Sequence, residues 1–394
     1  MTDIDDYHWL VGPEAERWLT ECAQSTEPSH SLQDRLRKVL SAERARLVAQ
    51  QVTLRQKAVE KFGEHANRMF FTDVALQQAT DQKIAAYKAS RFPGRKPTID
   101  YCCGIGGDLI ALAEHAPVIG WDRAPEMSLF AEANLRACNH DVQPRVCVGD
   151  VEEHPPHADD YWHLDPDRRV DGRRSTQVQW HSPAEDTIKN WLETAPHGAI
   201  KLAPATKLSP EWQAQSELEW ITRDRQCRQL VAWFGGLSQS VGQRRATVVG
   251  STASSFVGDS QCKASIADKI GDYVFDTDPA IRAAGLTGAL AATLSCAVIA
   301  SGEAYLTSSG PLEHPMLSRF RVTEILPFRM SELIKHVRRL GIGKLEIKTR
   351  GVSVQPEELR NKLKLAGSAS ATLLLTRQGI KEIAIFAERQ SQQG

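Results

Sequence analysis

Residues 98–108, TIDYCCGIGGD, constrain the fold more than any other part of this chain. The stretch begins like a short buried strand and ends with three glycines in four positions, Gly104, Gly106 and Gly107. A strand that leads through glycines into a helix exposes backbone amides and the positive end of a helix to a ligand. A Cβ would block that approach or forbid a turn with positive φ. Taken alone, the glycines also fit a simple turn.

The chain around this stretch predicts an α/β domain. Between residues 97 and 250, short apolar runs alternate with helical stretches, which is typical of a doubly wound parallel sheet. Seven runs are candidate strands: TIDYCC, PVIGWD, PRVCVGD, YWHLDPD, GAIKLAP, CRQLVAWFG and RRATVVG. Seven strands are enough for one complete domain of this kind.

The rest of the chain suggests three further segments, since 394 residues exceed one ordinary core. Apolar residues at helical intervals predict a helical region over 1–92, ahead of an α/β domain over 93–255. A helical connector is expected over 256–302. The last segment, 303–394, reads as strand, helix, strand, helix, strand, strand, which predicts a small α+β domain.

Terminal sequence, apolar stretches, cysteines and charge indicate where the protein acts and what it binds. The acidic start MTDIDDYHWL lacks the basic-then-apolar order of a secretory signal. The apolar stretch ALAATLSCAVIA is shorter than the ~20 residues that a membrane-spanning helix needs. We therefore expect a cytoplasmic protein with no membrane partner. The eight cysteines form no CxxC pair, so neither disulfides nor a metal is expected. From residue 301 onward, fifteen lysines and arginines face nine glutamates, which suggests a polyanionic partner; a solvated basic surface is the alternative.

A second acid strengthens the ligand-binding interpretation of the glycines. Asp122 ends the next candidate strand, 22 residues after Asp100. A carboxylate about 20 residues along accepts the ribose hydroxyls of a nucleotide in such folds. The glycine spacing is not the G-x-G-x-x-G of dinucleotide-binding enzymes, so a dehydrogenase is the least expected function.

With these features the sequence resembles the class I S-adenosylmethionine-dependent methyltransferases, which implies a Rossmann-like seven-stranded methyltransferase sheet and this cofactor. The resemblance implies that Asp100 and the glycine loop, Cys102, Gly104, Gly106 and Gly107, lie against the methionine part of the cofactor. It also implies that Asp122 holds the ribose. The third strand ends in VCVGD, and its Asp150 would lie by the adenine amine. Carboxylates suit adenosine because it offers hydroxyl and amine donors.

The fourth strand ends in HLDPDRR, where N-methylating members of this family commonly carry D-P-P-aromatic. By that likeness Asp165 and the backbone around Pro166 would accept hydrogen bonds from an amine, with Arg168 beside them at the reaction centre. Arg169 would hold a phosphate or carboxylate of the substrate. The second proline and the aromatic are absent here, so a strand terminator with surface arginines is the alternative.

The segment FFTDVALQQATDQKIAAYKA, followed by IDYCCGIGGDLIALA, is similar to trimethylguanosine synthase and related RNA guanine methyltransferases. That likeness suggests that Phe71, Thr72 and Thr80 border the cofactor or the acceptor. A core phenylalanine and a helix-capping threonine explain the same residues. The S-P-P-W of the synthase is missing, so cap methylation is not implied.

The C-terminal segment resembles the THUMP-like domain that follows a methyltransferase domain in a bacterial family. THUMP domains bind structured RNA in tRNA-modifying enzymes, so the resemblance implies tRNA or rRNA as partner, with a structural cap as the alternative. The basic residues expected to contact phosphates are Arg319, Arg321, Lys348, Arg350, Arg360, Lys362 and Lys364.

Together these features predict a methyltransferase that transfers the methyl group of S-adenosylmethionine to a base nitrogen of RNA. A small-molecule or protein methyltransferase is one alternative. The other is an RNA-binding protein whose methyltransferase domain retains the cofactor but no activity.

Overall fold

The structure, a computed structural model, describes residues 3–94, 96–138, 145–166, 169–170, 173–174, 182–300 and 305–390. The chain forms two compact units. Unit 1 contains residues 1–217 and 229–242, and unit 2 contains residues 218–228 and 243–394. The four segments expected from the sequence stay a prediction, because compactness alone divides the chain into two.

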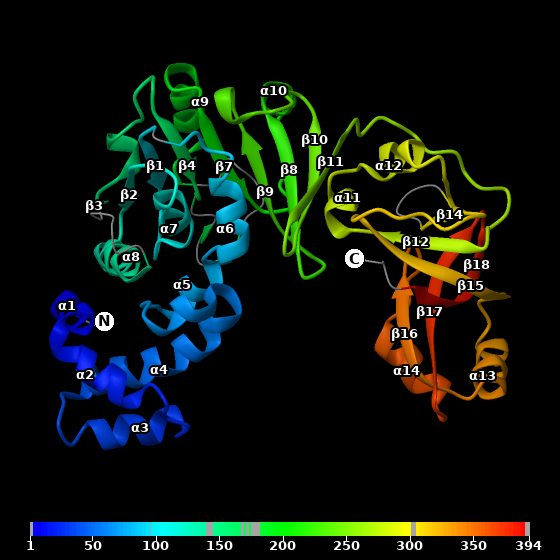
Figure 1. Cartoon of the computed structure of the whole chain (residues 1–394), viewed down its shortest axis with the longest axis horizontal. Helices are drawn as coiled ribbons and strands as arrows, with labels where there is room; N and C mark the ends of the chain where they lie inside the picture. Colours follow the sequence, from blue (N-terminus) through cyan, green and yellow to red (C-terminus); the bar gives the residue numbers. More distant parts are fainter. Residues whose placement is uncertain are drawn as a thin grey trace. The chain divides into compact units, whose positions relative to one another are not determined.

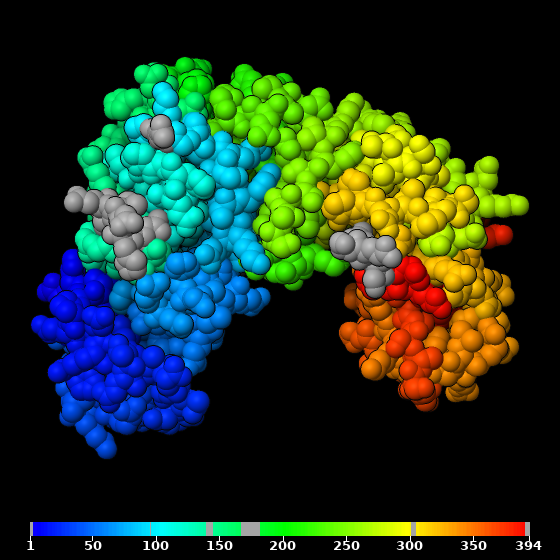
Figure 2. All heavy atoms as spheres, in the orientation of Figure 1, coloured from blue at the N-terminus to red at the C-terminus, as the bar shows by residue number. Residues whose placement is uncertain are grey.

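Unit 1 begins with helices, as the sequence predicts. They are α1 (Ile4–Val11), α2 (Pro13–Cys22), α3 (Ser29–Leu36), α4 (Ala42–Phe62), α5 (Asp73–Gln78) and α6 (Gln82–Ala89), with a 3-10 turn, η1 (Gly63–Asn67), after α4. Side-chain oxygens of Ser41, Thr72 and Asp81 accept from backbone amides at the starts of α4, α5 and α6, which fixes where these helices begin. Figure 2 shows the first of these helices, in dark blue, as a lobe of unit 1.

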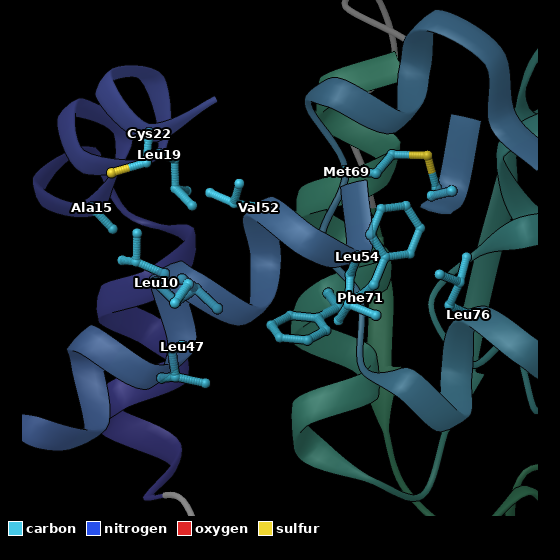
Figure 3. Close-up of a cluster of buried hydrophobic side chains, with 14 of the residues drawn as sticks. Leu10, Ala15, Leu19, Cys22, Leu47, Val52, Leu54, Met69, Phe71 and Leu76 are labelled. Atoms are coloured by element: carbon cyan, nitrogen blue, oxygen red, sulfur yellow. The ribbon is translucent and has the colours of Figure 1, made fainter. Parts of the chain in front are cut away.

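These helices share one apolar core with the start of the α/β layer. Leu10, Leu47, Leu54 and Phe71 are buried in it, together with Phe130 from the α/β layer (Figure 3 labels the first four). Phe71 is held further by Gln51, whose side-chain amide donates to its carbonyl at 2.6 Å and accepts from its N–H at 3.0 Å. The helical segment is therefore packed onto the layer that carries the candidate site.

The sheet of unit 1 contains β1 (Thr98–Tyr101), β2 (Val118–Asp122), β3 (Val146–Val148), β4 (Tyr161–Leu164), β7 (Gly198–Leu202) and β9 (Gln226–Trp233). Their order is β9-β7-β4-β1-β2-β3 (Figure 1). Strands β3, β2, β1, β4 and β7 are parallel, so their carboxyl ends meet at one edge. The helices α7 (Gly107–Ala113), α8 (Pro125–Cys138), α9 (Glu185–Thr194) and α10 (Pro210–Gln215) connect the strands.

The predicted α/β fold is confirmed, and all seven predicted strands are present, the seventh being β10 (Arg244–Val249) of unit 2. Two details differ. The sheet is mixed, because β9 runs antiparallel to β7. The sequence analysis also missed β8 (Glu217–Arg223), in which Glu217 and Glu219 interrupt the apolar run although both are fully buried.

The buried glutamates of β8 are satisfied by partners distant in sequence. Arg91, at the end of the helical segment, donates to Glu217 Oε2 at 3.0 Å and lies over the ring of Trp233. Glu217 also accepts from the amides of Gln239 and Ser240. Burial of a charged side chain requires such pairing.

Unit 2 contains two groups of strands. In the first, β10 pairs in parallel with β8 and antiparallel with β11 (Ala253–Gly258). The second is a seven-stranded sheet in the order β13-β14-β12-β15-β18-β17-β16. Its strands are β12 (Tyr273–Thr277), β13 (Ala297–Val298), β14 (Leu306–Ser308), β15 (Leu317–Pro327), β16 (Ile342–Thr349), β17 (Ala369–Gln378) and β18 (Lys381–Gln390).

Four helices accompany these strands: α11 (Pro279–Ala283), α12 (Thr287–Thr293), α13 (Met330–Arg339) and α14 (Pro356–Leu363). The order β15, α13, β16, α14, β17, β18 matches the predicted alternation of strands and helices. The three short strands β12, β13 and β14 were missed, because long-range pairing draws them into the sheet: β12 pairs with β15, β14 with β12, and β13 with β14. No helix in the described part of the chain is both long and apolar enough to cross a bilayer.

Arg91→Met should destabilise the protein by about 3 kcal/mol, because it leaves the carboxylate of Glu217 buried without its ionic partner. Urea denaturation followed by tryptophan fluorescence measures the loss. Arg136→Met is the matched control, since Arg136 pairs with Glu132 on an exposed helix surface, and such pairs contribute about 0.5 kcal/mol. Equal effects of the two substitutions would contradict a structural role for the Arg91 pair.

Candidate active site

The loop after β1 adopts the left-handed backbone conformation three times. The φ angles are +56° at Cys102, +54° at Gly104 and +86° at Gly106. A non-glycine residue in this conformation costs about 1 kcal/mol or more, so Cys102 stores strain that the surrounding structure must hold. Such strain concentrates at functional sites.

The three glycines serve different purposes. A Cβ on Gly104 would meet nothing within 4 Å, whereas one on Gly106 would lie 3.4 Å from Ala131 of α8. A Cβ on Gly107 would come within 3.2 Å of the backbone of Thr80, between α5 and α6. Gly107 therefore permits close packing, Gly106 provides the left-handed backbone conformation, and Gly104 opens onto free space.

Asp122, at the carboxyl end of β2, holds this loop in place. Its Oδ2 accepts from the Gly104 amide at 2.8 Å and its Oδ1 from the Ala124 amide at 3.0 Å. Burial raises the pKa of Asp122, and the two amide donors oppose that shift. A carboxylate has further lone pairs, so both oxygens can still accept from a ligand.

Asp150 follows β3 and is exposed. Its side chain accepts from the Glu152 amide at the start of a 3-10 turn, η2 (Val151–Glu153). Nearby, the imidazole of His154 stacks on the indole of Trp121 with ring centroids 4.0 Å apart. The ends of β2 and β3 thus present two carboxylates beside an aromatic stack.

A chain of buried polar side chains lies beneath the glycine loop. Lys88 of α6 contacts Asp108 Oδ1 at 2.8 Å and His163 Nε2 at 3.1 Å. His163 Nδ1 lies 2.7 Å from Asp100 Oδ1, and the Thr80 hydroxyl donates to Asp108 Oδ2 at 2.6 Å. The two ring nitrogens of His163 therefore bridge Lys88 and Asp100.

Burial dominates the electrostatics of this chain. It raises the pKa of Asp100, which the facing His163 opposes, and it lowers the pKa of Lys88, which the Asp108 carboxylate opposes. Burial would also raise the pKa of Asp108, but Lys88 and His163 hold that pKa below its ordinary value. Asp100 Oδ2 is buried and has no hydrogen-bond partner among the described residues. A buried carboxylate oxygen without a donor calls for a partner that the described residues do not supply, such as a water molecule or a ligand.

At the end of β4, Asp165 forms an ion pair that the sequence did not indicate. Its Oδ2 lies 2.5 Å from Nζ of Lys201 in β7, and the Lys201 side chain is only 7% exposed. Pro166 is buried beside it. Arg168 lies outside the described residues, and only the backbone of Arg169 is described, in β5 (Arg169–Val170).

The other predicted substrate-binding residues have structural contacts. Phe71 is 1% exposed in the helical core, and the Thr72 side chain caps α5. Thr80 bonds to Asp108 rather than capping a helix, since Asp81 caps α6. Their predicted contact with cofactor or acceptor stays a prediction.

The glycine loop is also tied to the residue preceding Phe71. Asn134 of α8, fully buried, donates to the carbonyls of Phe70 and Ile105 at 3.0 and 2.9 Å and accepts from the Phe70 amide at 2.6 Å. The site therefore depends on contacts between segments that are far apart in sequence.

The predicted basic residues of unit 2 do not form one group. Lys348 and Arg350 converge on the buried carboxylate of Asp276, whereas Arg319 pairs with Glu313. Arg360 pairs with Glu357 on α14, Lys362 is exposed on the same helix, and Lys364 follows its end.

Sequence analysis missed Lys88, His163 and Lys201. The available signal was a polar residue inside an apolar strand, as in YWHL for His163 and GAIKL for Lys201. Such residues are buried only when paired. The two cysteines next to the glycines need no catalytic role, because burial raises the pKa of both the Cys102 and Cys103 thiols well above its ordinary value.

Comparison with known proteins adds three findings. The family described as THUMP domain-like matches residues 317–389. An uncharacterized S-adenosylmethionine-dependent methyltransferase of Mycobacterium tuberculosis, found in strains CDC 1551 and H37Rv, is 31% identical over 345 residues, which are 86% of this chain and 94% of the relative. A crystal structure of a candidate methyltransferase from Porphyromonas gingivalis W83 superposes with a TM-score of 0.83 at 20% identity, over 99% of this chain and 100% of that one.

Asp108→Asn should destabilise the protein by about 3–5 kcal/mol, because Lys88 then keeps a buried charge without its counter-ion. The amide oxygen preserves an acceptor for Thr80. Adding Lys88→Met removes the orphaned charge, so the double variant should be more stable than Asp108→Asn alone. Glu185→Gln, which breaks the more exposed pair with Lys189, should cost less than about 1 kcal/mol in the same denaturation assay.

The cost of Asp108→Asn should depend on pH. Because the folded pKa of Asp108 lies below its unfolded value of about 3.9, its stabilisation is complete above that pH and disappears as pH falls through the folded pKa. Unfolding free energies of wild type and variant should therefore differ fully at pH 7 and converge only below about pH 4. Convergence between pH 5 and 7 would contradict the pairing.

Proposed function

Because the chain belongs to the S-adenosylmethionine-dependent methyltransferases with a C-terminal THUMP-like domain, we propose that it methylates a base nitrogen of RNA. It is a methyltransferase of the class EC 2.1.1.-, with S-adenosylmethionine as its cofactor. The acceptor is the proposed part. One observation carries the proposed site. A strained glycine loop begins just after Asp100, is open at Gly104, and is bonded through the Gly104 amide to the carboxylate of Asp122.

The residues of this loop fit the cofactor. Gly104 leaves room where a Cβ would fill the cradle, and the unpartnered Oδ2 of Asp100 can accept from the amino group of the methionine part. Asp122 would hold the ribose and Asp150 the adenine amine, while Cys102, Gly106 and Gly107 shape the loop. When bound, S-adenosylmethionine supplies an electrophilic methyl group on a cationic sulfur.

The end of β4 would receive the acceptor. Asp165 and the carbonyl groups around Pro166 can accept hydrogen bonds from an amine and so orient its lone pair. Lys201 occupies Oδ2 of Asp165 and fixes the rotamer of that carboxylate, which leaves Oδ1 for the acceptor. Arg168 and Arg169 would contact a phosphate of the substrate, and Phe71, Thr72 and Thr80 would border the site from the helical segment.

The THUMP domain-like match over residues 317–389 supports RNA, tRNA or rRNA, as the acceptor. The surplus of positive charge after residue 301 agrees with it. We also propose the division into 1–92, 93–255, 256–302 and 303–394, with the last segment as the RNA-binding domain.

Incubation with methyl-labelled S-adenosylmethionine and separate RNA, protein and metabolite fractions tests the acceptor. Label should enter the RNA fraction and disappear on nuclease treatment. Asp165→Ala should reduce that incorporation about 100-fold and leave cofactor affinity unchanged, because its carboxylate orients only the acceptor. Label in protein or metabolites would replace RNA as the acceptor, and RNA binding without label in any fraction would indicate an inactive domain.

Asp122→Ala should weaken S-adenosylmethionine binding about 100-fold, since it removes two charge-assisted hydrogen bonds and the clamp on Gly104. Isothermal titration calorimetry measures the loss. Asp159→Ala is the control, because Asp159 is exposed and precedes β4, at the opposite edge of the sheet. Unchanged affinity in Asp122→Ala would remove the ribose assignment.

A further inference from the structure

A group of cations in unit 2 converges on one buried carboxylate. Asp276 is 1% exposed, and its Oδ1 lies 2.9 Å from Arg350 and 3.5 Å from Arg282. Its Oδ2 lies 3.0 Å from Lys348 and 3.3 Å from Arg225. We call these five residues the Asp276 cluster.

The cluster is assembled from four parts of unit 2. Asp276 lies in β12 and Lys348 in β16, although three strands separate β12 from β16 in the sheet order. The sheet must therefore curl until side chains of both strands meet. Arg282 comes from α11 and Arg225 from the turn between β8 and β9, so both lie outside the THUMP domain-like match.

The cluster carries more positive charge than its carboxylate can balance. Two more carboxylates lie nearby: Asp278, which caps α11, and Glu346, which pairs with Arg389. Counting these groups as well, five cations face three carboxylates among the residues that the structure describes. Burial would raise the pKa of Asp276, but Arg350 and Lys348 hold it below its ordinary value, so this carboxylate is ionised at neutral pH.

The cations are not sealed inside the protein. The side chain of Arg225 is 45% exposed, that of Arg350 22%, and that of Lys348 17%. A carboxylate that only needed neutralising would be satisfied by one or two of them, and each further cation adds repulsion. A solvent-facing surplus of guanidinium and ammonium groups is suited to an anion with several oxygens.

The backbone at Arg225 provides independent support. Asp224 and Arg225 both have positive φ, +49° and +57°, at the tip of the hairpin between β8 and β9. Asparagine or aspartate is preferred at the first such position and glycine at the second, so Asp224 is favourable there, whereas Arg225 costs about 1 kcal/mol or more. Despite this cost, Arg225 is aimed at the cluster, and its second guanidinium nitrogen donates to the Ser318 hydroxyl at 2.7 Å.

We propose that the Asp276 cluster is a phosphate-binding site for the backbone of the RNA acceptor, a proposal that rests on the function proposed above. Asp276 holds the cations in place, and Arg225 and Arg350 contact the phosphate oxygens. The site extends the RNA-binding surface beyond residues 317–389 to the β8–β9 turn and α11.

Binding of bulk tRNA to the full-length protein, measured as a function of salt, tests the site. Arg225→Gln should weaken binding about tenfold at ~0.1 M salt and reduce the slope of log affinity against log salt by about 0.7–0.9. Arg225→Lys should retain most of the affinity because it keeps the charge. Lys335→Gln, an equal loss of charge at an exposed position of α13, should change binding less than threefold. Equal losses in Arg225→Gln and Lys335→Gln would overturn the site.

Asp276→Asn tests whether the Asp276 cluster serves RNA binding or only the stability of the protein. With the carboxylate neutralised, the cations lose their internal partner, so tRNA affinity should rise if the variant retains the wild-type thermal transition. A cluster that serves only stability would lose stability without any gain in affinity. If Asp276→Asn fails to fold, Arg350→Gln takes its place and should again weaken binding about tenfold.

Two further outcomes separate this inference from the proposed function. If RNA is methylated but Arg225→Gln and Arg350→Gln bind tRNA like wild type, the function stands and the site is overturned. If the methyl group goes to another fraction while both variants still lose tRNA affinity, the function fails and the site stands. Binding of inorganic phosphate to the protein, with no tRNA binding at low salt, would overturn RNA as the source of the phosphate.

Discussion

The buried chain from Thr80 through Asp108, Lys88 and His163 to Asp100 is the interaction on which the site of unit 1 depends. Its members come from the α5–α6 link, α7, α6, β4 and β1, so it joins the helical segment to the sheet at the level of the glycine loop. A buried charge with one partner missing costs several kcal/mol, so none of these elements can shift alone. The helical segment thus supports the candidate site, even though it carries none of the glycines and carboxylates that are assigned to the cofactor.

The strained glycine loop depends on this buried chain of polar side chains for support. Left-handed Cys102 and the close contact of Gly107 with Thr80 are tolerable only where neighbouring elements fix the backbone. Asp122 clamps the loop from one side and Asn134 holds it from the other. For the proposed cofactor site this support would leave the loop preformed, and preorganisation of this kind reduces the entropic cost of binding.

Sequence reasoning predicted the parts of the molecule that local patterns encode. Strands ending in Asp100, Asp122 and Asp150 and the order of β15 to β18 are visible as apolar periodicity and punctuation. What could not be predicted depends on distant partners. Strand β8 was missed because its glutamates become buried only through Arg91 and Thr247, and Lys201 because its partner Asp165 lies in another strand. Periodicity carries no information about such pairs.

The same distinction applies to unit 2. A basic C-terminal region is evident from composition, but composition cannot separate cations that neutralise their neighbours from cations that converge. Arg319 and Arg360 are paired with glutamates, whereas Lys348 and Arg350 share Asp276 with two arginines from outside the basic segment. A carboxylate inside a cation cluster weakens attraction for an anion, yet it also removes the rotamer entropy that free arginines would lose on binding. Because one carboxylate holds four cationic side chains, the cluster attracts an anion less strongly than free cations would. It also keeps those side chains in fixed positions, which suits the binding of an extended acceptor.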